Sequence, residues 1–481
     1  MGSFDKIQQR EQGLSKALTT RQIGMIALGG AIGTGLFLGS KFAISYAGPS
    51  VIISYAIGAL IALLLMAALA EMTIQHPTSG SFGAYAEHYI GPMAGFLVRI
   101  SYWSCLVLAV GTEVTAIGTY MGFWLPEVPG LVWILGFSAV LIGVNMFNVH
   151  AFGTLEYWLS SVKVFAIIAF IIMSAIAVFG RLSPEFGFHN YTAEGGFMPN
   201  GVWGMWIAVI VSIFSYLSIE MVAVAAGEAA EPEVATKKAF RTVILRLFIF
   251  YICTLALIVA IAPTSKILEG GSPFVTVMGV MGIPFADSII NFIVIIAALS
   301  AMNSQLYTST RMAFSLSRSG DAPKFVGRVH GNGSPINALV LSALGIAVAT
   351  VVYVINPEHA FTVMMAVSMF GAMFTWFMIF VSHIFFRRDL ARRGVPQKYK
   401  LPFYPVGTWL GAFLMLAILL TTLFTDSSFN MTLIFGIPFL VLISVWYWIR
   451  VRPRKLAELA AERDASDERV ESPVPEDRLP N

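Results

Sequence analysis

The chain alternates between long apolar runs and short polar segments. A window of about twenty residues, the length that an α-helix needs to cross a hydrocarbon core, finds apolar runs near residues 22–45, 50–74, 95–122, 131–149, 156–180, 202–226, 242–262, 285–315, 336–355, 361–385, 406–425 and 429–449. These runs are longer than a strand needs, and they lack the apolar and polar alternation of a barrel wall. The pattern therefore predicts an all-α integral membrane protein with about twelve transmembrane helices.

The composition agrees with this pattern and excludes several other classes of protein. Hydrophobic residues make up 57% of the 481 positions and charged residues only 12%, about half the charged share of a soluble globular protein. The net charge of +3 is small and the basic residues lie between apolar runs and in the tails, so no nucleic-acid-binding face is expected. Cys105 and Cys253 lie inside apolar runs and the histidines lack ligand spacing, so neither a metal site nor a cofactor is expected. The absence of a nucleophile elbow, a phosphate-binding loop and paired catalytic carboxylates argues against an enzyme.

The positions of lysine and arginine predict the orientation. If both ends are cytoplasmic, 26 of the 30 basic residues fall inside, Lys41, Arg181 and Lys266 fall outside, and Lys163 lies within the membrane. This bias predicts an even number of spans with both termini in the cytoplasm. Residues 1–21 then form a cytoplasmic segment without a cleavable signal, residues 22–450 the transmembrane domain, and residues 451–481 a charged cytoplasmic tail that begins with a short interfacial helix and ends disordered.

The first span carries a cluster of glycines at mid-membrane depth. Gly29, Gly30, Gly33 and Gly35 fall within seven residues, which is costly for an uninterrupted helix. Such a cluster either lets helices pack closely through small residues, or unwinds locally and frees backbone groups to line a cavity. We favour the unwinding, because discontinuous helices mark binding sites in transporters.

The sixth span gives a second signal of the same kind. Residues 214–221 carry serines and Glu220 where a lipid-facing helix would carry leucine. Placing a carboxylate inside the membrane costs free energy, so such a residue is by default a candidate functional residue. Spans one and six stand five spans apart, as an inverted repeat of five helices requires.

Four segments resemble bacterial amino acid permeases of the amino acid–polyamine–organocation superfamily, in its amino acid transporter family branch. They are LGGAIGTGLFLGS at 28–40 with AGPS at 47–50, AFGTLEYWLSSVKV at 151–164, FSYLSIEMVAVAAGEAAEP at 214–232, and ALSAMNSQLYTSTRMAFSLSRSGDAPK at 298–324. The resemblance implies two inverted five-helix repeats plus two extra C-terminal helices, with helices one and six broken. It also implies a secondary active transporter of the bacterial inner membrane, which imports an amino acid with protons by alternating access.

The resemblance also implies a substrate site at the two breaks. The unwound part of helix one receives the substrate carboxylate, a role that falls on Ile32, Gly33, Thr34 and Gly35; exposed N–H groups at a half-helix N-terminus favour an anion. Carbonyls of broken helix six would accept from the substrate ammonium, namely those of Phe214, Ser215 and Leu217. Selectivity for the side chain would then fall to Tyr216, Ser218, Glu113, Ser300 and Asn303. Ser218 stands where the family usually has glycine and should narrow the pocket.

Proton coupling is assigned to Lys163, Glu220 and Glu228. Lys163 is the one cation placed deep in a span, at a position where proton-coupled relatives carry a lysine, although snorkelling toward an interface would also explain it. A cation near the break of span one would occupy the place where sodium-coupled relatives hold their ion, so protons are favoured over sodium. Glu220 either braces helix six or helps to carry the proton. Glu228 acts in gating, in capping nearby basic residues, or in proton transfer.

We therefore expect an amino acid:proton symporter whose partners are its substrate, protons and membrane lipid, with no obligate protein partner. Glu113 is the one acidic side chain left for the pocket, and Ser218 and Tyr216 add bulk, so a neutral amino acid of small to medium size is expected. The alternatives are an amino acid exchanger of the same fold, or a permease for basic amino acids or γ-aminobutyrate. A channel would need a filter-like repeat or rings of charge, and a receptor would need a sizeable soluble domain; the sequence contains neither.

Overall fold

The computed structural model describes residues 3–14, 18–147, 149–269, 271–331, 333–400, 403–425 and 428–457. Within these ranges, ten helical segments are long and apolar enough to cross a membrane. The broken first span and the interrupted seventh span bring the number of spans to twelve, as the hydropathy pattern predicts. No strand occurs in these ranges beyond an isolated backbone bridge. The predicted all-α membrane fold is therefore confirmed.

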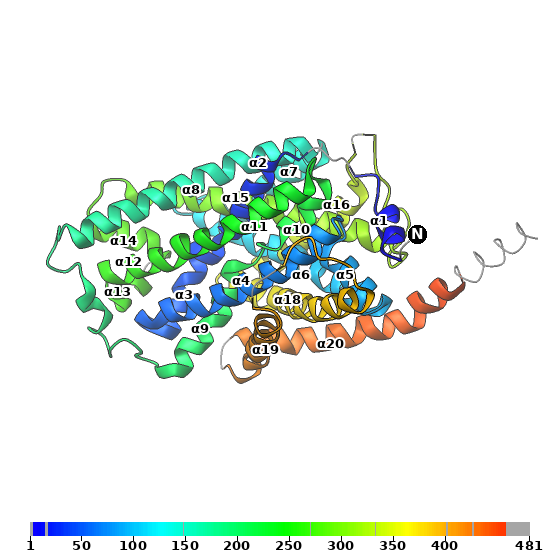
Figure 1. Cartoon of the computed structure of the whole chain (residues 1–481). Coiled ribbons are helices and arrows are strands. Elements are labelled where there is room, and N and C mark those ends of the chain that lie inside the picture. The colour runs from blue at the N-terminus through cyan, green and yellow to red at the C-terminus, as the bar shows by residue number, and fades with distance from the viewer. Residues whose placement is uncertain are drawn as a thin grey trace, which may run out of the picture.

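The spans follow one another with short connections (Figure 1). After the short helix α1 (Ser3–Arg10), the first half comprises α2 (Thr20–Ala31), a π-turn (Gly35–Gly39) and α3 (Ser40–Ala47) as span one, then α4 (Val51–Gln75), the connecting helix α5 (Ser81–Tyr89), α6 (Pro92–Met121), α7 (Gly130–Phe147) and α8 (Val149–Phe179). The second half comprises α9 (Gly201–Tyr216) and α10 (Met221–Ala225) as span six, then α11 (Pro232–Leu247), a second π-turn (Phe248–Cys253) and α12 (Thr254–Ile261) as span seven. It continues with the short helices α13 (Thr264–Glu269) and α14 (Pro273–Val280), then α15 (Ala286–Arg318), α16 (Ile336–Ser342) with α17 (Leu344–Ile355), α18 (Ala360–Arg393), α19 (Val406–Thr421) and α20 (Met431–Trp446).

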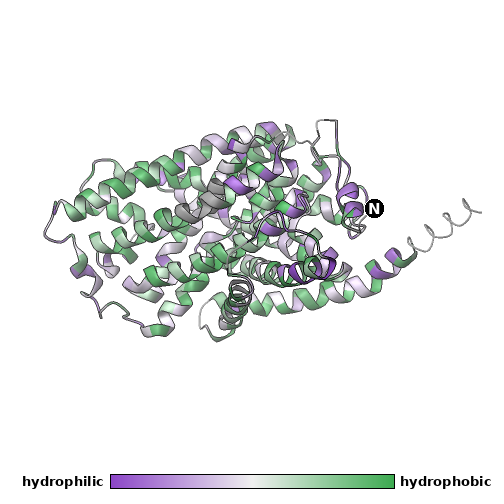
Figure 2. Ribbon diagram, in the orientation of Figure 1, coloured by the Kyte–Doolittle hydropathy of each residue, from purple (hydrophilic) through white to green (hydrophobic). Residues whose placement is uncertain are grey.

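The helix packing places the two broken spans against each other inside the bundle. The half-helix α3 packs on α9, whereas α2 packs on α10, α8 and α15. The long helices α6, α15 and α18 pack together beside them, and α19 and α20 lie at the outer edge against α18 (Figure 1). Hydrophobic residues cover the outer helices, whereas hydrophilic residues gather toward the ends of the bundle (Figure 2). The breaks are thus shielded from lipid by other helices.

Two helices extend further than their apolar runs predict. Helix α8 begins at Val149, where the apolar run begins near residue 156, and α18 continues to Arg393, where the run ends near 385. A hydropathy window finds the apolar part of a helix, but a helix ends where its backbone bonding ends, and polar residues do not stop it. The true bounds place Lys163 at the centre of α8. Of the tail predicted for residues 451–481, helix continues to Ala457, and residues 458–481 lie outside the described residues.

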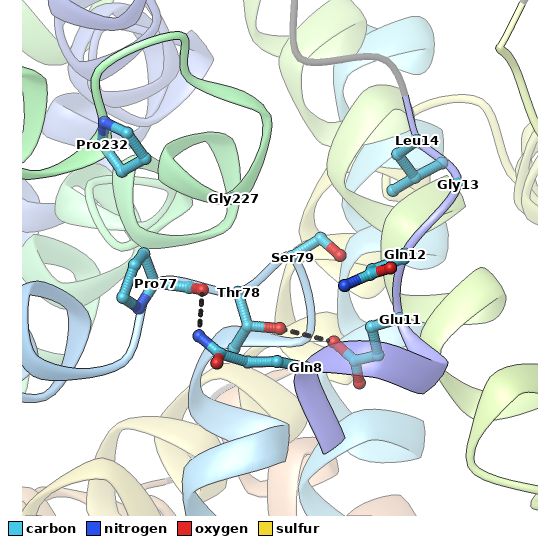
Figure 3. Close-up of a pocket in the computed structure, with 10 residues that line it drawn as sticks. All are labelled: Gln8, Glu11, Gln12, Gly13, Leu14, Pro77, Thr78, Ser79, Gly227 and Pro232. Carbon is cyan, nitrogen blue, oxygen red and sulfur yellow. Dashed lines mark hydrogen bonds between the residues drawn. The ribbon is translucent and has the colours of Figure 1, made fainter. Parts of the chain in front are cut away.

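The residue 3–14 segment and the end of α20 lie at the same end of the bundle (Figure 1), which we call the termini-bearing end. There, the Glu11 carboxylate accepts hydrogen bonds from Gly80 N (2.6 Å), Thr78 Oγ1 (2.8 Å) and Ser315 Oγ (2.7 Å). Gln8 donates a hydrogen bond to the Pro77 carbonyl, and Thr78 donates one to Glu11; these four residues line part of a cavity of about 530 Å³ (Figure 3). Glu11 therefore joins the N-terminal segment to the α4–α5 loop and to the end of α15.

A second polar group surrounds the buried Arg99 at the same end. Its Nη1 lies 2.7 Å from Glu87, which also pairs with Arg10. Burial by itself would raise the pKa of Glu87, but the positive charges of Arg99 and Arg10 outweigh it and lower the pKa to about 2. Glu87 thus stays ionised and holds α1, α5 and α6 together.

The segment before span one is also bonded to the end of span six through the backbone. Leu18 N donates to the Glu228 carbonyl, and Ala230 N donates to the Leu18 carbonyl, each over 3.2 Å. No side chain takes part in either bond. The two broken spans are therefore joined directly at the termini-bearing end.

His76, which follows α4, is packed beneath helix α1. Its ring centroid lies 4.1 Å from that of Phe4, and its Nε2 lies 2.7 Å from the Tyr89 hydroxyl. Burial, followed by the nearby His88 and Lys398, lowers the pKa of His76 from 6.5 to about 4. The folded protein therefore keeps His76 neutral at pH values where the unfolded chain would protonate it.

We predict that His76 makes stability fall on acidification. Because the folded pKa is below the unfolded one, the contribution of neutral His76 is complete above about pH 6.5 and is lost as the pH falls toward 4. Between pH 7 and pH 5, the melting temperature of detergent-solubilised His76→Gln should therefore fall less than that of the wild type. His189→Gln, at an exposed histidine, is the control and should keep the wild-type slope; equal slopes for all three proteins would contradict the prediction.

Candidate functional site

Span one is interrupted where the glycine cluster predicts. Helix α2 ends at Ala31, Ile32 and Gly33 form a bend, and the chain turns helical again at Thr34, just before the π-turn that begins at Gly35. Ile32 is 1% exposed and Thr34 is fully buried. The unwinding is therefore confirmed, and it lies in the protein interior, where freed backbone groups need protein or ligand partners.

Span six is interrupted between α9 and α10. Residues 217–220 form a turn, and Ser218 has a φ of +85°. Residues with a Cβ rarely adopt this left-handed conformation, whereas glycine adopts it freely. This geometry suits glycine better than serine and means that Ser218 is strained.

The two breaks touch each other through small residues. A Cβ placed on Gly35 would lie 2.8 Å from the Ser215 Cα, and one on Gly30 would lie 3.2 Å from the Ser218 Cβ. Ser215 Oγ donates a 2.8 Å hydrogen bond to the Gly35 carbonyl. The glycine cluster therefore serves both unwinding and close packing, the two explanations that the sequence leaves open.

Glu113 of α6 points at the break of span one. Its Oε2 accepts a 3.4 Å hydrogen bond from Thr34 N, and its Oε1 lies 3.0 Å from where a Cβ on Gly33 would be. Glu113 is only 2% exposed. A carboxylate of the chain itself thus occupies the region where the sequence resemblance implies the carboxylate of a ligand.

Lys163 of α8 reaches the same break from another side. Its Nζ donates a 2.8 Å hydrogen bond to the Ile32 carbonyl, and the residue is fully buried. From the centre of α8, either end is about 20 Å away at 1.5 Å per residue, which is beyond the reach of a lysine side chain. The snorkelling explanation for Lys163 is therefore wrong.

The carbonyls of broken helix six are mostly occupied. The Phe214 carbonyl accepts from Leu217 N (3.2 Å), and the Ser215 carbonyl accepts from the Tyr251 hydroxyl (2.8 Å). Among the described residues, the Leu217 carbonyl has no such partner. Of the three carbonyls expected to receive an ammonium group, Leu217 is thus the one left open.

Tyr216, which was expected to contact the side chain of a ligand, contacts residues of spans two and seven. Its hydroxyl donates to the Tyr55 carbonyl of α4 (3.0 Å), and its ring centroid lies 4.5 Å from that of Tyr251. The direction of Tyr216 around α9 was not evident from the sequence. Its role in this structure is to hold span six against spans two and seven.

Ser300 and Asn303 of α15 are likewise turned toward another partner. Ser300 Oγ makes a short hydrogen bond to Glu156 of α8, and Asn303 Nδ2 donates to the same carboxylate over 3.1 Å. The α15 residue nearest the break is instead Ala301, whose Cβ lies 3.0 Å from where a Cβ on Gly33 would be. Sequence reasoning missed Glu156, although it lies seven residues before Lys163 and therefore on the same helix face.

Glu220 and Glu228 are held by different partners. Glu220 Oε1 accepts from the Tyr102 hydroxyl of α6 over 2.5 Å, which braces the break of span six against span three. Glu228 lies at the termini-bearing end and accepts from Arg311 Nε (2.7 Å) and Arg311 Nη2 (3.1 Å). A fully buried carboxylate paired with two of the three guanidinium nitrogens of an arginine is suited to holding spans six and eight together.

Several buried polar atoms near the breaks have no hydrogen-bond partner among the described residues. They are Thr34 Oγ1, Ser218 Oγ, Glu220 Oε2 and Gln305 Oε1. Gln305 lies one turn beyond Ala301 on α15 and was not singled out from the sequence. Buried polar groups in native structures normally have partners, so this set indicates a site for a polar ligand.

Comparisons with known proteins agree with this arrangement. The family model "Amino acid permease" matches residues 22–460. The chain is 39% identical over 466 residues to the amino acid permease YtnA of Bacillus subtilis, covering 96% of this chain and all of that protein. It is also 39% identical over 419 residues to the aromatic amino acid transport protein AroP of Escherichia coli K12, covering 87% of this chain and 92% of that protein.

We predict that the contact between the two breaks tolerates no added methyl group at Gly35. In Gly35→Ala, the new Cβ would press on the backbone of Ser215, which cannot rotate away, and such overpacking costs about 1–3 kcal/mol. The melting temperature of the purified protein should therefore fall. Gly24→Ala is the matched control, because a Cβ there meets nothing within 4 Å. A melting temperature that falls no further in Gly35→Ala than in Gly24→Ala would contradict the contact.

Proposed function

The chain belongs to the amino acid permease family, and we propose that it is a secondary active transporter that imports an amino acid together with protons by alternating access. We place it in the bacterial plasma membrane with both termini in the cytoplasm. The observation that carries the proposal is the break of span one, where the Thr34 N–H donates to a carboxylate and the Ile32 carbonyl accepts from an amine. These are the backbone groups that an amino acid would need.

In this proposal the substrate carboxylate competes with Glu113 for the N–H groups at the break. Two carboxylates cannot share a buried site cheaply unless one is protonated. Protonation of Glu113 would weaken its hold on Thr34 and open the position for the substrate. Uptake of a proton and binding of an amino acid would then favour each other.

Lys163 supports protons over sodium as the coupling ion. Its Nζ already occupies the position next to the Ile32 carbonyl, where a metal cation would need oxygen ligands. A buried lysine can exchange a proton because burial disfavours its charged form. Any change in its charge would act directly on the backbone of the break.

Glu228 and Glu11 are better suited to gating than to proton transfer. Glu228 is held by Arg311, and Glu11 by Gly80, Thr78 and Ser315. These bonds connect span six, span eight and the N-terminal segment at the termini-bearing end. We propose that they close the cytoplasmic side and must break before the substrate is released.

The substrate that we propose is a neutral amino acid of small to medium size. Glu113 is engaged with the break, which leaves it poorly placed to bind a cationic side chain. Ser218 adds a side chain where the family usually has none. Aromatic amino acids are the second candidate, because relatives that are 39% identical are named for their transport.

Counterflow into proteoliposomes tests the proposal. Labelled amino acids should exchange across the membrane, and an inside-alkaline pH gradient should drive accumulation above the equilibrium level. Exchange without gradient-driven accumulation would indicate an exchanger of the same fold. Competition by unlabelled alanine, serine, threonine, proline, phenylalanine, tryptophan, lysine and arginine then separates the substrate classes: inhibition by lysine or arginine alone would contradict a neutral substrate.

We predict that Lys163→Ala abolishes proton-driven accumulation while some substrate binding remains. The variant loses the group that exchanges a proton next to the Ile32 carbonyl, but the N–H groups of the break stay in place. Accumulation would be measured under the pH gradient, and binding with labelled substrate in detergent. Lys266→Ala, at an exposed lysine, is the control. Full accumulation by Lys163→Ala would refute the coupling role.

We predict that Ser218→Gly both stabilises the protein and broadens its substrate range. Glycine relieves a left-handed conformation that costs about 1 kcal/mol for a residue with a Cβ, and it widens the pocket toward larger side chains. Ser138→Gly, in the interior of α7, is the control and should lower the melting temperature. An unchanged competition profile for Ser218→Gly would mean that residue 218 does not face the substrate.

A further inference from the structure

Glu156 is a buried carboxylate that the proposed transport cycle does not use. It lies on α8, is fully buried, and accepts hydrogen bonds from Ser160 Oγ (2.9 Å), Ser300 Oγ and Asn303 Nδ2 (3.1 Å). Asn303 is itself fixed by Asn145 of α7, whose Nδ2 donates to Asn303 Oδ1 over 2.8 Å. Three helices therefore contribute to the surroundings of this one side chain.

The groups around Glu156 are arranged for a negative charge. Two hydroxyls and one amide NH₂ all donate to it, and two of the three donors are on α15. Donors favour the ionised form of a carboxylate, which can only accept. A buried negative charge nevertheless requires a positive partner, because an unpaired charge inside a membrane protein is very costly.

Lys163 is the positive partner that the helix geometry supplies. It lies seven residues after Glu156, which is about two turns or 10 Å along the same face of α8. Glu156 and Glu113 both act electrostatically on Lys163, and Lys163 acts on Glu156. The hydrogen bonds that Glu156 accepts from Ser160 of α8 and from Ser300 and Asn303 of α15 all come from neutral donors.

Counting charges separates the roles of the two carboxylates. If Lys163, Glu156 and Glu113 were all ionised, the buried group would carry a net charge of minus one. Glu156 accepts three hydrogen bonds of 3.1 Å or less, whereas Glu113 accepts a longer one of 3.4 Å from Thr34 N and lies beside the side chains of Thr34 and Gln305. Glu156 is thus the better stabilised anion, and Glu113 is the carboxylate free to take a proton.

We propose that Glu156 is the fixed counter-charge of Lys163, a positioning residue that sets how tightly Lys163 holds its proton. This inference rests on the proposed proton coupling and adds to it a residue outside the substrate site. Because α15 and α7 hold Glu156 in place, the charge stays at a constant distance from Lys163. The proton affinity of Lys163 is then tuned by a residue that does not itself contact the break of span one.

The test is the pH dependence of uptake by Glu156→Gln in proteoliposomes. Glutamine keeps the size and an acceptor oxygen but removes the charge that stabilises protonated Lys163. Proton binding should weaken, so the pH at which uptake is half-maximal should move down by about one unit, the effect of a unit charge about 10 Å away at an effective dielectric constant of about 20. Ser160→Ala, which keeps the charge and removes one donor, is the matched control and should shift the midpoint much less.

A double-mutant cycle on melting temperature gives a readout that needs no transport. Glu156→Gln and Lys163→Gln should each destabilise the protein by leaving the other charge unpaired, and the double variant should be more stable than the sum of the two losses predicts. Glu156→Gln combined with Lys266→Gln should be additive. If Glu156→Gln alone yields no folded protein, recovery of folding in the double variant supports the pairing, and failure to recover overturns it.

The outcomes separate this inference from the proposed function. The role of Glu156 would be overturned, with proton coupling left intact, if the losses of stability in Glu156→Gln and Lys163→Gln were additive. It would also be overturned if the wild type is proton-driven and Glu156→Gln has the same pH of half-maximal uptake as the wild type. If uptake by the wild-type protein does not depend on the pH gradient, the proposed proton coupling is wrong, and so is the proposal that Glu156 tunes it.

Discussion

A backbone group that leaves a helix inside a membrane must find another partner, and this requirement organises the centre of the protein. At the break of span one, Thr34 N finds Glu113, the Ile32 carbonyl finds Lys163, and the Gly35 carbonyl finds the Ser215 hydroxyl. Ionisable residues are therefore buried here because the interrupted helix offers them partners. Because each buried charge needs a charge of the opposite sign nearby, the cluster of polar residues extends from the break to the neighbouring helices.

The same requirement explains why the interior falls into distinct zones. Near the breaks, the charged groups of Glu113 and Lys163 bond to the backbone of span one. At the termini-bearing end, Glu228 with Arg311 and Glu87 with Arg99 form direct ion pairs. Direct pairs with arginine hold a fixed charge and suit a structure that opens and closes, whereas looser groups suit a site whose charge changes.

The sequence was sufficient for the fold but not for the directions of side chains. Apolar runs located all twelve spans, and the glycine cluster and Glu220 located both breaks. Tyr216, Ser300 and Asn303 were assigned to the site because they lie on the right helices, yet tertiary packing turns them toward Tyr55 and Glu156. Glu156 lies where the apolar run of span five begins, and hydropathy alone does not distinguish a buried carboxylate at that position from a residue at the membrane boundary. The unusual φ of Ser218 could be found only from coordinates.

The backbone bonds between Leu18 and the segment at residues 228–230 have a consequence for how this region can diverge. Bonds made by the main chain place no demand on the identity of the side chains that flank them. The two main-chain bonds survive any replacement that keeps the N–H, whereas proline at position 18 or 230 would remove a donor, because proline has no N–H. The buried side chains of Leu18 and Ala229 still limit which other replacements fit.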